Sequence, residues 1–166
     1  MMLLVFSVCA APFVLGTLAY FFYKPEGRIN YGNLLETKPI VLPAGKTLAG
    51  VEPSSAEFKG KWWLLHSCKT DCETELYATR QARTMLNKDR EKVQRLILVA
   101  SPPSDDLKNK HPDAQWLVGS ATPSPHPNSI LLVDPLSNQV LSWPKAPDIK
   151  RMHKDLSRLM RVNQTG

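Results

Sequence analysis

The stretch KWWLLHSCKTDCETE, residues Lys61–Glu75, joins a short apolar run to two cysteines four positions apart. Its apolar part, WWLLH, predicts a short strand. Thr70 and Glu73 then have the spacing of a capping box, which predicts that a helix starts here and that Cys72 lies in its first turn. The strand, the cysteine pair and the helix are therefore expected to follow one another directly.

The residues beyond this stretch continue the alternation of helix and strand patterns. Apolar residues recur on one helical face as far as Asn87, and RLILVA, Arg95–Ala100, predicts a second buried strand of the parallel type. A short helix is expected at Asp105–Lys110. Nearer the C-terminus, ILLVD and QVLSW predict two strands joined by the turn PLSN, and Asp148–Arg161 predicts an amphipathic helix.

The expected element order is strand, helix, strand, connection, strand, strand, helix. A crossover between the first two strands and a closing hairpin make a mixed sheet with helices on its faces. This is an α/β, thioredoxin-like order, and it is assigned to residues 58–166 as one domain. Residues 25–57 are rich in proline, glycine and turn residues, so they predict a linker and an N-terminal hairpin.

The N-terminal run Met2–Tyr23 contains no charged side chain. It is long enough for a bilayer-spanning helix, so residues 1–24 are predicted to be a single transmembrane anchor. A cleaved signal peptide is the alternative, but the run has neither a basic start nor a small-residue cleavage motif at its end. Two cations after the run, Lys24 and Arg28, would by the positive-inside rule place the domain on the cytoplasmic side.

The whole sequence of 166 residues has a formal net charge of +6. This excess of lysine and arginine favours contact with an anionic membrane surface or an acidic protein, and it identifies neither. A nucleic acid is not among the expected partners.

Cys68 and Cys72 are the candidate reactive residues. If Cys72 lies in the first turn of the helix, both sulfurs converge at the helix N-terminus, where free N–H groups and the helix dipole stabilise a thiolate. Two thiolates are soft ligands that suit Cu(I) or zinc, whereas the same separation also permits a disulfide. Redox enzymes usually have two residues between such cysteines rather than three. Thiol–disulfide exchange, metal binding and a structural disulfide therefore remain open.

A metal site at this pair requires a third donor, for which the sequence contains four histidines. His126 has the most favourable position, because it lies in a proline-bracketed loop just before the third strand, and that loop is expected beside the N-terminus of the first helix. His66 lies two residues before Cys68 and is a second possibility. His153 is expected to pack in the core, and His111 to be solvated.

These residues resemble the Sco/SenC family, which comprises membrane-anchored, thioredoxin-like copper chaperones for cytochrome c oxidase. The resemblance lies in FKGKWWLLHSCKTDC and in HPNSILLVDP, where Pro135 follows His126 by nine residues. It extends over about Phe58–Leu141 and the N-terminal anchor. The prolines that follow each cysteine in the family are Lys69 and Glu73 here, so the chain resembles a divergent member.

The resemblance implies that Cys68, Cys72 and His126 bind copper, and that the chain is a metallochaperone rather than an enzyme. The implied partners are subunit II of cytochrome c oxidase or other assembly factors. The implied location is the inner membrane with the domain in the periplasm, or an intermembrane space, which outweighs the charge bias beside the anchor. Two alternatives remain: a thiol–disulfide reductase that uses Cys68 and Cys72 on client cysteines, and a non-catalytic docking factor.

Overall fold

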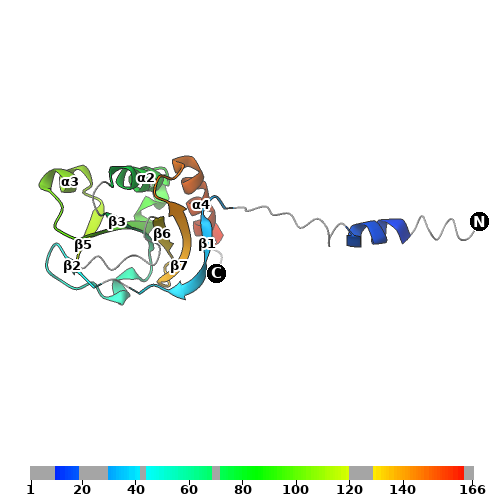
Figure 1. The fold of residues 1–166 in the computed structure, drawn as a ribbon, viewed down its shortest axis with the longest axis horizontal. Coiled ribbons are helices and arrows are strands. Elements are labelled where there is room, and N and C mark those ends of the chain that lie inside the picture. Colours follow the sequence, from blue (N-terminus) through cyan, green and yellow to red (C-terminus); the bar gives the residue numbers. More distant parts are fainter. Residues whose placement is uncertain (1–9, 19–29, 42–43, 69–71, 120–128, 163–166) are drawn as a thin grey trace, which may run out of the picture.

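The structure, a computed structural model, describes residues 10–18, 30–41, 44–68, 72–119 and 129–162. Its body is one seven-stranded mixed sheet in the order β1-β7-β6-β3-β4-β5-β2, with helices on its faces (Figure 1). The strands are β1 (Asn33–Pro39), β2 (Lys46–Thr47), β3 (Trp62–Cys68), β4 (Val93–Val99), β5 (Ala114–Val118), β6 (Ser129–Val133) and β7 (Asn138–Pro144). The α-helices are α2 (Glu73–Thr84), α3 (Asp105–Lys110) and α4 (Ile149–Val162), and the 3-10 helices are η1 (Ser55–Phe58) and η2 (Asn87–Lys92).

The centre of the sheet is the predicted crossover. Strands β3 and β4 are parallel, with Cys68 opposite Val99, and α2 connects them. Both strands are buried because both faces of the sheet are covered, as expected for parallel strands. Both tryptophans of the predicted strand are buried, Trp62 at 6% and Trp63 at 3% exposure.

Hydrophobic clusters cover both faces of the sheet. Trp62 packs with buried residues of α2 and α4, whereas Trp63 packs with Phe58 of η1 on the opposite face. The Trp63 indole also donates a hydrogen bond to the carbonyl of Phe58 at 3.2 Å. Adjacent strand residues point to opposite faces, so one short run of sequence contributes to the clusters on both faces.

The predicted C-terminal hairpin forms between β6 and β7. Its turn is held by Asp134, whose Oδ1 accepts hydrogen bonds from the backbone of Leu136 and Asn138. Ser137 has a φ of 69°, the left-handed conformation that a tight turn requires. The hairpin is followed directly by α4, as the sequence predicts.

The N-terminal hairpin predicted in residues 25–57 is wrong. The strands of this segment do not pair with each other: β1 pairs with β7 at one edge of the sheet, and β2 pairs with β5 at the other. The physical reason is that each has an unpaired edge strand available to it, so the segment crosses the sheet instead of folding back on itself.

Strand β1 starts near the edge of the sheet at which β3 ends. Asn33 pairs with Ser142, which pairs with Leu131, and Leu131 pairs with Leu65. Each of these three pairings is antiparallel, so β1 runs opposite to β3. The chain therefore enters the sheet from the side towards which β3 runs, and Asn33 is level with Leu65, three residues before Cys68.

Residues 10–18 of the predicted anchor are helical, with Thr17 Oγ1 donating to the carbonyl of Phe13. The rest of the predicted span lies outside the described residues. Within the part of the chain that the structure describes, no helix reaches the length and apolar character that crossing a membrane requires.

Candidate functional site

Cys68 and Cys72 are joined by a disulfide, with their Cα atoms 5.3 Å apart. Cys68 is the last residue of β3, and Cys72 is the N-cap of α2, so the bond links the end of a central strand to the start of the helix that follows it. Cys72 is predicted in the first turn of the helix, but it lies one residue before it, because the helix begins at Glu73. Thr70 of the predicted capping box lies outside the described residues.

The two sulfurs differ in their access to solvent. Cys72 is 4% exposed and packs with buried Leu76, Ile97 and Trp116, whereas Cys68 is half-buried at the edge of the same cluster. A partner molecule approaching from solvent can therefore reach Cys68 more easily than Cys72.

His66, the second candidate donor, is 1% exposed. Neither ring nitrogen has a hydrogen-bond partner among the described residues. Burial, and after it the charge of Arg95, lowers the pKa of His66 to about 3, so its ring is neutral at physiological pH. The described residues contain no cluster of three histidine, cysteine or acidic side chains that could hold a metal ion. His66 is therefore not assembled with the cysteines as a third donor.

The burial of His111 and His153 is the reverse of what the sequence predicts. His126, the preferred donor, lies outside the described residues, so its role remains a prediction. His111 is buried at 8% exposure rather than solvated, and burial lowers its pKa. His153 is only half-buried, and its Nε2 lies 3.1 Å from Ser157 Oγ.

A buried arginine lies in β4, opposite Leu64 of β3, where the sequence predicts only a buried apolar strand. Arg95 of β4 is fully buried; it donates to Leu76 O at 2.8 Å and Thr79 Oγ1 at 3.1 Å, both on α2, and to Asp113 Oδ1 at 2.9 Å. Burial lowers the pKa of Arg95, and the Asp113 carboxylate opposes that shift. The only sequence signal for it is the charged first letter of RLILVA, which alone does not distinguish a strand end from a buried ion pair.

Glu75 is a second buried charge that the sequence did not reveal. It lies in the first turn of α2, 3% exposed, with Oε1 at 3.5 Å from Lys145 Nζ. Its Oε2 has no hydrogen-bond partner among the described residues. The helical pattern of the sequence does not predict that a polar side chain at this position of α2 is buried.

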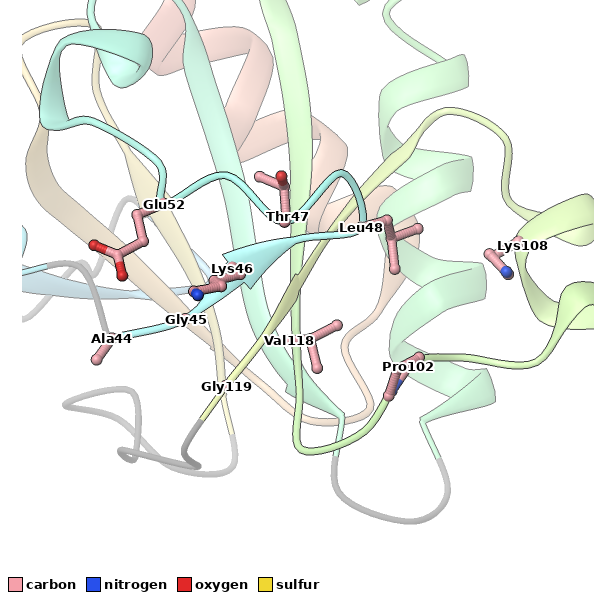
Figure 2. Close-up of a pocket in the computed structure, with 11 residues that line it drawn as sticks. Ala44, Gly45, Lys46, Thr47, Leu48, Glu52, Pro102, Lys108, Val118 and Gly119 are labelled. Atoms are coloured by element: carbon pink, nitrogen blue, oxygen red, sulfur yellow. The ribbon is translucent and has the colours of Figure 1, made fainter.

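A pocket of about 720 Å³ opens at the edge of the sheet formed by β5 and β2. Figure 2 shows its lining, in which Leu48 and Val118 supply apolar surface, Lys46 and Lys108 supply cations, and Pro102 follows β4. Cys68, Val99 and Val118 lie in one row across β3, β4 and β5. Two strand spacings therefore separate the backbones of Cys68 and Val118, which is about 10 Å. The pocket is thus within reach of a molecule bound at the disulfide.

Comparison with solved structures identifies the fold. Apo Sco1 from Thermus thermophilus is similar, with a TM-score of 0.60 and 23% identity over 78% of this chain and 96% of that one. Copper-bound yeast Sco1 has a TM-score of 0.57 and 16% identity, covering 81% and 95% of the two chains. The thioredoxin domain of a thiol-disulfide oxidoreductase from Bacteroides vulgatus has a TM-score of 0.52 and 16% identity, covering 75% and 98%. The predicted thioredoxin-like fold, and the resemblance to Sco and SenC proteins at the level of the fold, are confirmed.

The sequence itself matches one family. Residues 62–163, well over half of the chain, match the family described as "Transmembrane-like, thioredoxin-like, C-terminal domain". No curated protein matches the sequence.

Proposed function

Since this chain belongs to the family of transmembrane-like, thioredoxin-like C-terminal domains, we propose that it is a membrane-anchored copper metallochaperone for the assembly of cytochrome c oxidase. The observation that carries the proposal is the position of the Cys68–Cys72 disulfide at the start of α2 in a Sco-like fold. Sulfurs close enough to bond to each other can, once reduced, bind the same soft metal ion.

Copper is the cargo in this proposal. Reduction of the disulfide by an external dithiol supplies two electrons and two protons and yields two thiols. Cys68 and Cys72, as thiolates, and His126, which precedes β6 in the sequence, would then hold Cu(I). A site with few ligands, one of them the half-buried Cys68, suits transfer, because a partner's ligands can replace those of the chaperone one at a time.

The fit of the described residues to copper rests on donor chemistry. Two cysteine sulfurs favour Cu(I) over hard cations such as magnesium. Cys68 is only half-buried, so the ligands of a client protein can approach it from solvent. We propose subunit II of cytochrome c oxidase, or another assembly factor, as that client.

The proposed location is the inner membrane with a single N-terminal span, residues 1–24, and the domain in the periplasm or an intermembrane space. Met2–Tyr23 supplies the apolar length. A disulfide between Cys68 and Cys72 fits an oxidising compartment.

The test is an anaerobic Cu(I) titration of the reduced full-length protein in detergent, compared with Cys68→Ser, Cys72→Ser and His126→Ala. We expect one copper per chain, loss of tight binding in either cysteine variant, and weakened binding in His126→Ala. His153→Ala is the matched control, since its ring lies on α4, and it should bind as the natural protein does. Unchanged affinity in all three site variants would refute copper carriage by this pair.

A thiol–disulfide reductase is the second candidate, and the disulfide itself favours it. In that reaction the Cys68 thiolate attacks a client disulfide and releases one client thiol; Cys72 then attacks the mixed disulfide and releases the other. The client gains two electrons and two protons, and the Cys68–Cys72 disulfide forms. Reduction of a disulfide-bonded peptide at equal rates by the natural protein and His126→Ala, with no copper retained on purification, would favour this function over metal transfer.

A further inference from the structure

The exposed face of α4 carries a concentrated positive charge. Its exposed residues include five cations: Lys150, Arg151, Lys154, Arg158 and Arg161. The only carboxylate within the helix is Asp155, which is 3% exposed and faces the body. The opposite side of the helix, formed by Met152, Leu156 and Met160, packs against the sheet. Packing therefore explains the apolar side of α4 and gives no reason for the uniform charge of the other.

These cations are largely unneutralised by the rest of the protein. Arg151 lies 3.8 Å from Asp148 and its guanidinium is 5.6 Å from the centre of the Tyr31 ring. The other four form no ion pair with any described residue. By contrast, the two lysines of α3 pair with aspartates on the same helix, Lys108 with Asp105 and Lys110 with Asp106. The α4 face is thus available to an anionic partner.

The N-terminal end of the folded body is fixed to this same helix. The amides of Tyr31 and Gly32 donate to the Asp155 carboxylate at 3.1 and 2.8 Å, and the Asp148 amide donates to the Tyr31 hydroxyl at 3.2 Å. Figure 1 shows the start of β1 beside α4. The chain therefore leaves the body next to the cationic face.

Tether length limits how far this face can lie from a membrane. Lys24 ends the proposed anchor, and Tyr31 is seven residues later. Seven extended residues span at most about 25 Å, so Tyr31 and the turn of α4 that contains Asp155 lie within about that distance of the bilayer surface. Attraction between exposed charges acts over a Debye length of about 8 Å at physiological salt, a separation that so short a tether readily permits.

We propose that the cationic face of α4 lies on the anionic phospholipid headgroups of the bilayer that anchors the chain. Cationic helical faces bind anionic lipid through lysine and arginine near the surface. The inference rests on the membrane anchor of the proposed function and is independent of copper binding and of thiol chemistry. It assigns α4 a second role besides covering the sheet, which is to orient the domain on the membrane.

The experiment is lysine acylation of the full-length protein in lipid nanodiscs, read out residue by residue by mass spectrometry. The discs contain phosphatidylcholine alone, or phosphatidylcholine with phosphatidylglycerol. With the anionic lipid, Lys150 and Lys154 should be labelled at about one third of their rate in phosphatidylcholine alone, or more slowly. The exposed reference lysines Lys46 and Lys61 should keep their rates. Raising the salt from about 0.15 to about 1 M should restore labelling, because the Debye length then falls to about 3 Å.

Variants test whether the charge of the face is responsible. Arg158→Gln with Arg161→Gln removes two cations from α4 without removing the probe lysines, and should weaken their protection. Lys59→Gln with Lys108→Gln removes the same charge elsewhere and should leave the protection unchanged.

The outcomes separate this inference from the anchor. A chain that does not co-purify with the discs overturns the anchor and this inference together. A chain that does so, with Lys150 and Lys154 labelled equally in both lipids, overturns the contact of α4 alone.

Discussion

The unequal exposure of the two bonded cysteines gives them different chemical roles. Cys68 is half-buried at the end of β3, whereas Cys72 is 4% exposed among apolar side chains. In thiol–disulfide exchange, the accessible thiolate attacks the partner and the sheltered one resolves the mixed disulfide. We therefore expect Cys68 to form every covalent or metal-bridged contact with a client first.

A single-cysteine comparison tests this order. Cys72→Ser should accumulate a stable mixed disulfide with glutathione through Cys68, because the resolving thiol is missing. Cys68→Ser should form far less adduct over the same time, since Cys72 is buried. Intact mass spectrometry under non-reducing conditions measures both, and equal adduct formation in the two variants would contradict the assignment.

His66 makes stability dependent on pH. Its pKa is lowered from 6.5 to about 3 by burial and by Arg95, so below pH 6.5 the unfolded chain binds a proton that the folded chain does not. Stability contributed by the neutral ring is therefore lost as the pH falls from 6.5 towards 3. Between pH 7 and pH 5 this loss amounts to about 2 kcal/mol.

Replacement of the histidine should remove that loss. His66→Leu is expected to be about as stable as the natural protein at pH 7, because it also removes two unpaired buried nitrogens. At pH 5 it should be more stable by about 2 kcal/mol in urea unfolding. His153→Leu serves as the control at a half-buried site and should keep the natural pH dependence; parallel curves for all three proteins would disprove the role of His66.

At the scale of elements, Arg95 connects β4 to α2 and to the segment before β5. Its guanidinium is fully buried and balanced by Asp113, which also lies 3.3 Å from Arg83. Burial opposes the charged form of Asp113, but Arg95 lowers the pKa of this carboxyl below its usual value. The carboxylate is therefore charged at neutral pH, and its loss leaves a buried cation without a counter-ion.

Asp113→Ala should lower the free energy of unfolding by about 3 kcal/mol, which is the lower end for breaking a buried ion pair because Asp113 is partly exposed. Asp113→Asn should lose less, since the amide keeps an acceptor for Arg95. The matched control is Asp106→Ala, which removes an exposed partner of Lys110 and should leave the unfolding midpoint unchanged. A similar small effect at both sites would show that the ion pair at Asp113 is not structural.

Elements with a strong periodic pattern could be predicted, and those held by sheet edges could not. WWLLH and RLILVA are apolar enough to read as strands on their own, and β3 and β4 confirm them. Strand β1 is mostly exposed, so its sequence NLLETKP has no buried face to detect. The helix α2 ends at Thr84, before the predicted Asn87, because Asn87 itself adopts a φ of 51°, a conformation that ends a helix.

The same contrast applies to the candidate site. The cysteine pair is local in sequence, and the strand and helix patterns on either side were enough to place it. The burial of His66, His111 and Glu75 was not visible, because each depends on which elements cover that part of the sheet. Such packing is a property of the tertiary structure, and one polar residue in a strand or helix pattern carries no record of it.

At the scale of the whole molecule, Asp155 joins both ends of the folded body. Its carboxylate accepts hydrogen bonds from the backbone amides of Tyr31 and Gly32. It also accepts one from the indole N–H of Trp143, at 3.1 Å. It is buried, so these hydrogen bonds replace the water that the charge loses on folding. The start of β1 is thereby held on α4.

Asp155→Ala should lower the free energy of unfolding by about 3 kcal/mol, since hydrogen bonds to a charged group contribute about 1.5–3 kcal/mol each and water can replace only some of them. Amide hydrogen exchange at Tyr31 and Gly32 should accelerate more than exchange in β3 and β4. Asp155→Asn keeps the shape and should show a smaller change of the same sign. Equal acceleration throughout the sheet would mean that Asp155 supports global stability rather than the N-terminal junction.

The direction of β1 has a consequence for where the protein finds its clients. The polypeptide enters the sheet from the side towards which β3 runs to Cys68, and Asn33 lies three strands, about 14 Å, from Leu65 of β3. In an anchored chain, the sulfur of Cys68 then stays close to the membrane surface and does not move through bulk solvent. Encounters become a search in two dimensions, which raises the local concentration of proteins embedded nearby and disfavours soluble ones.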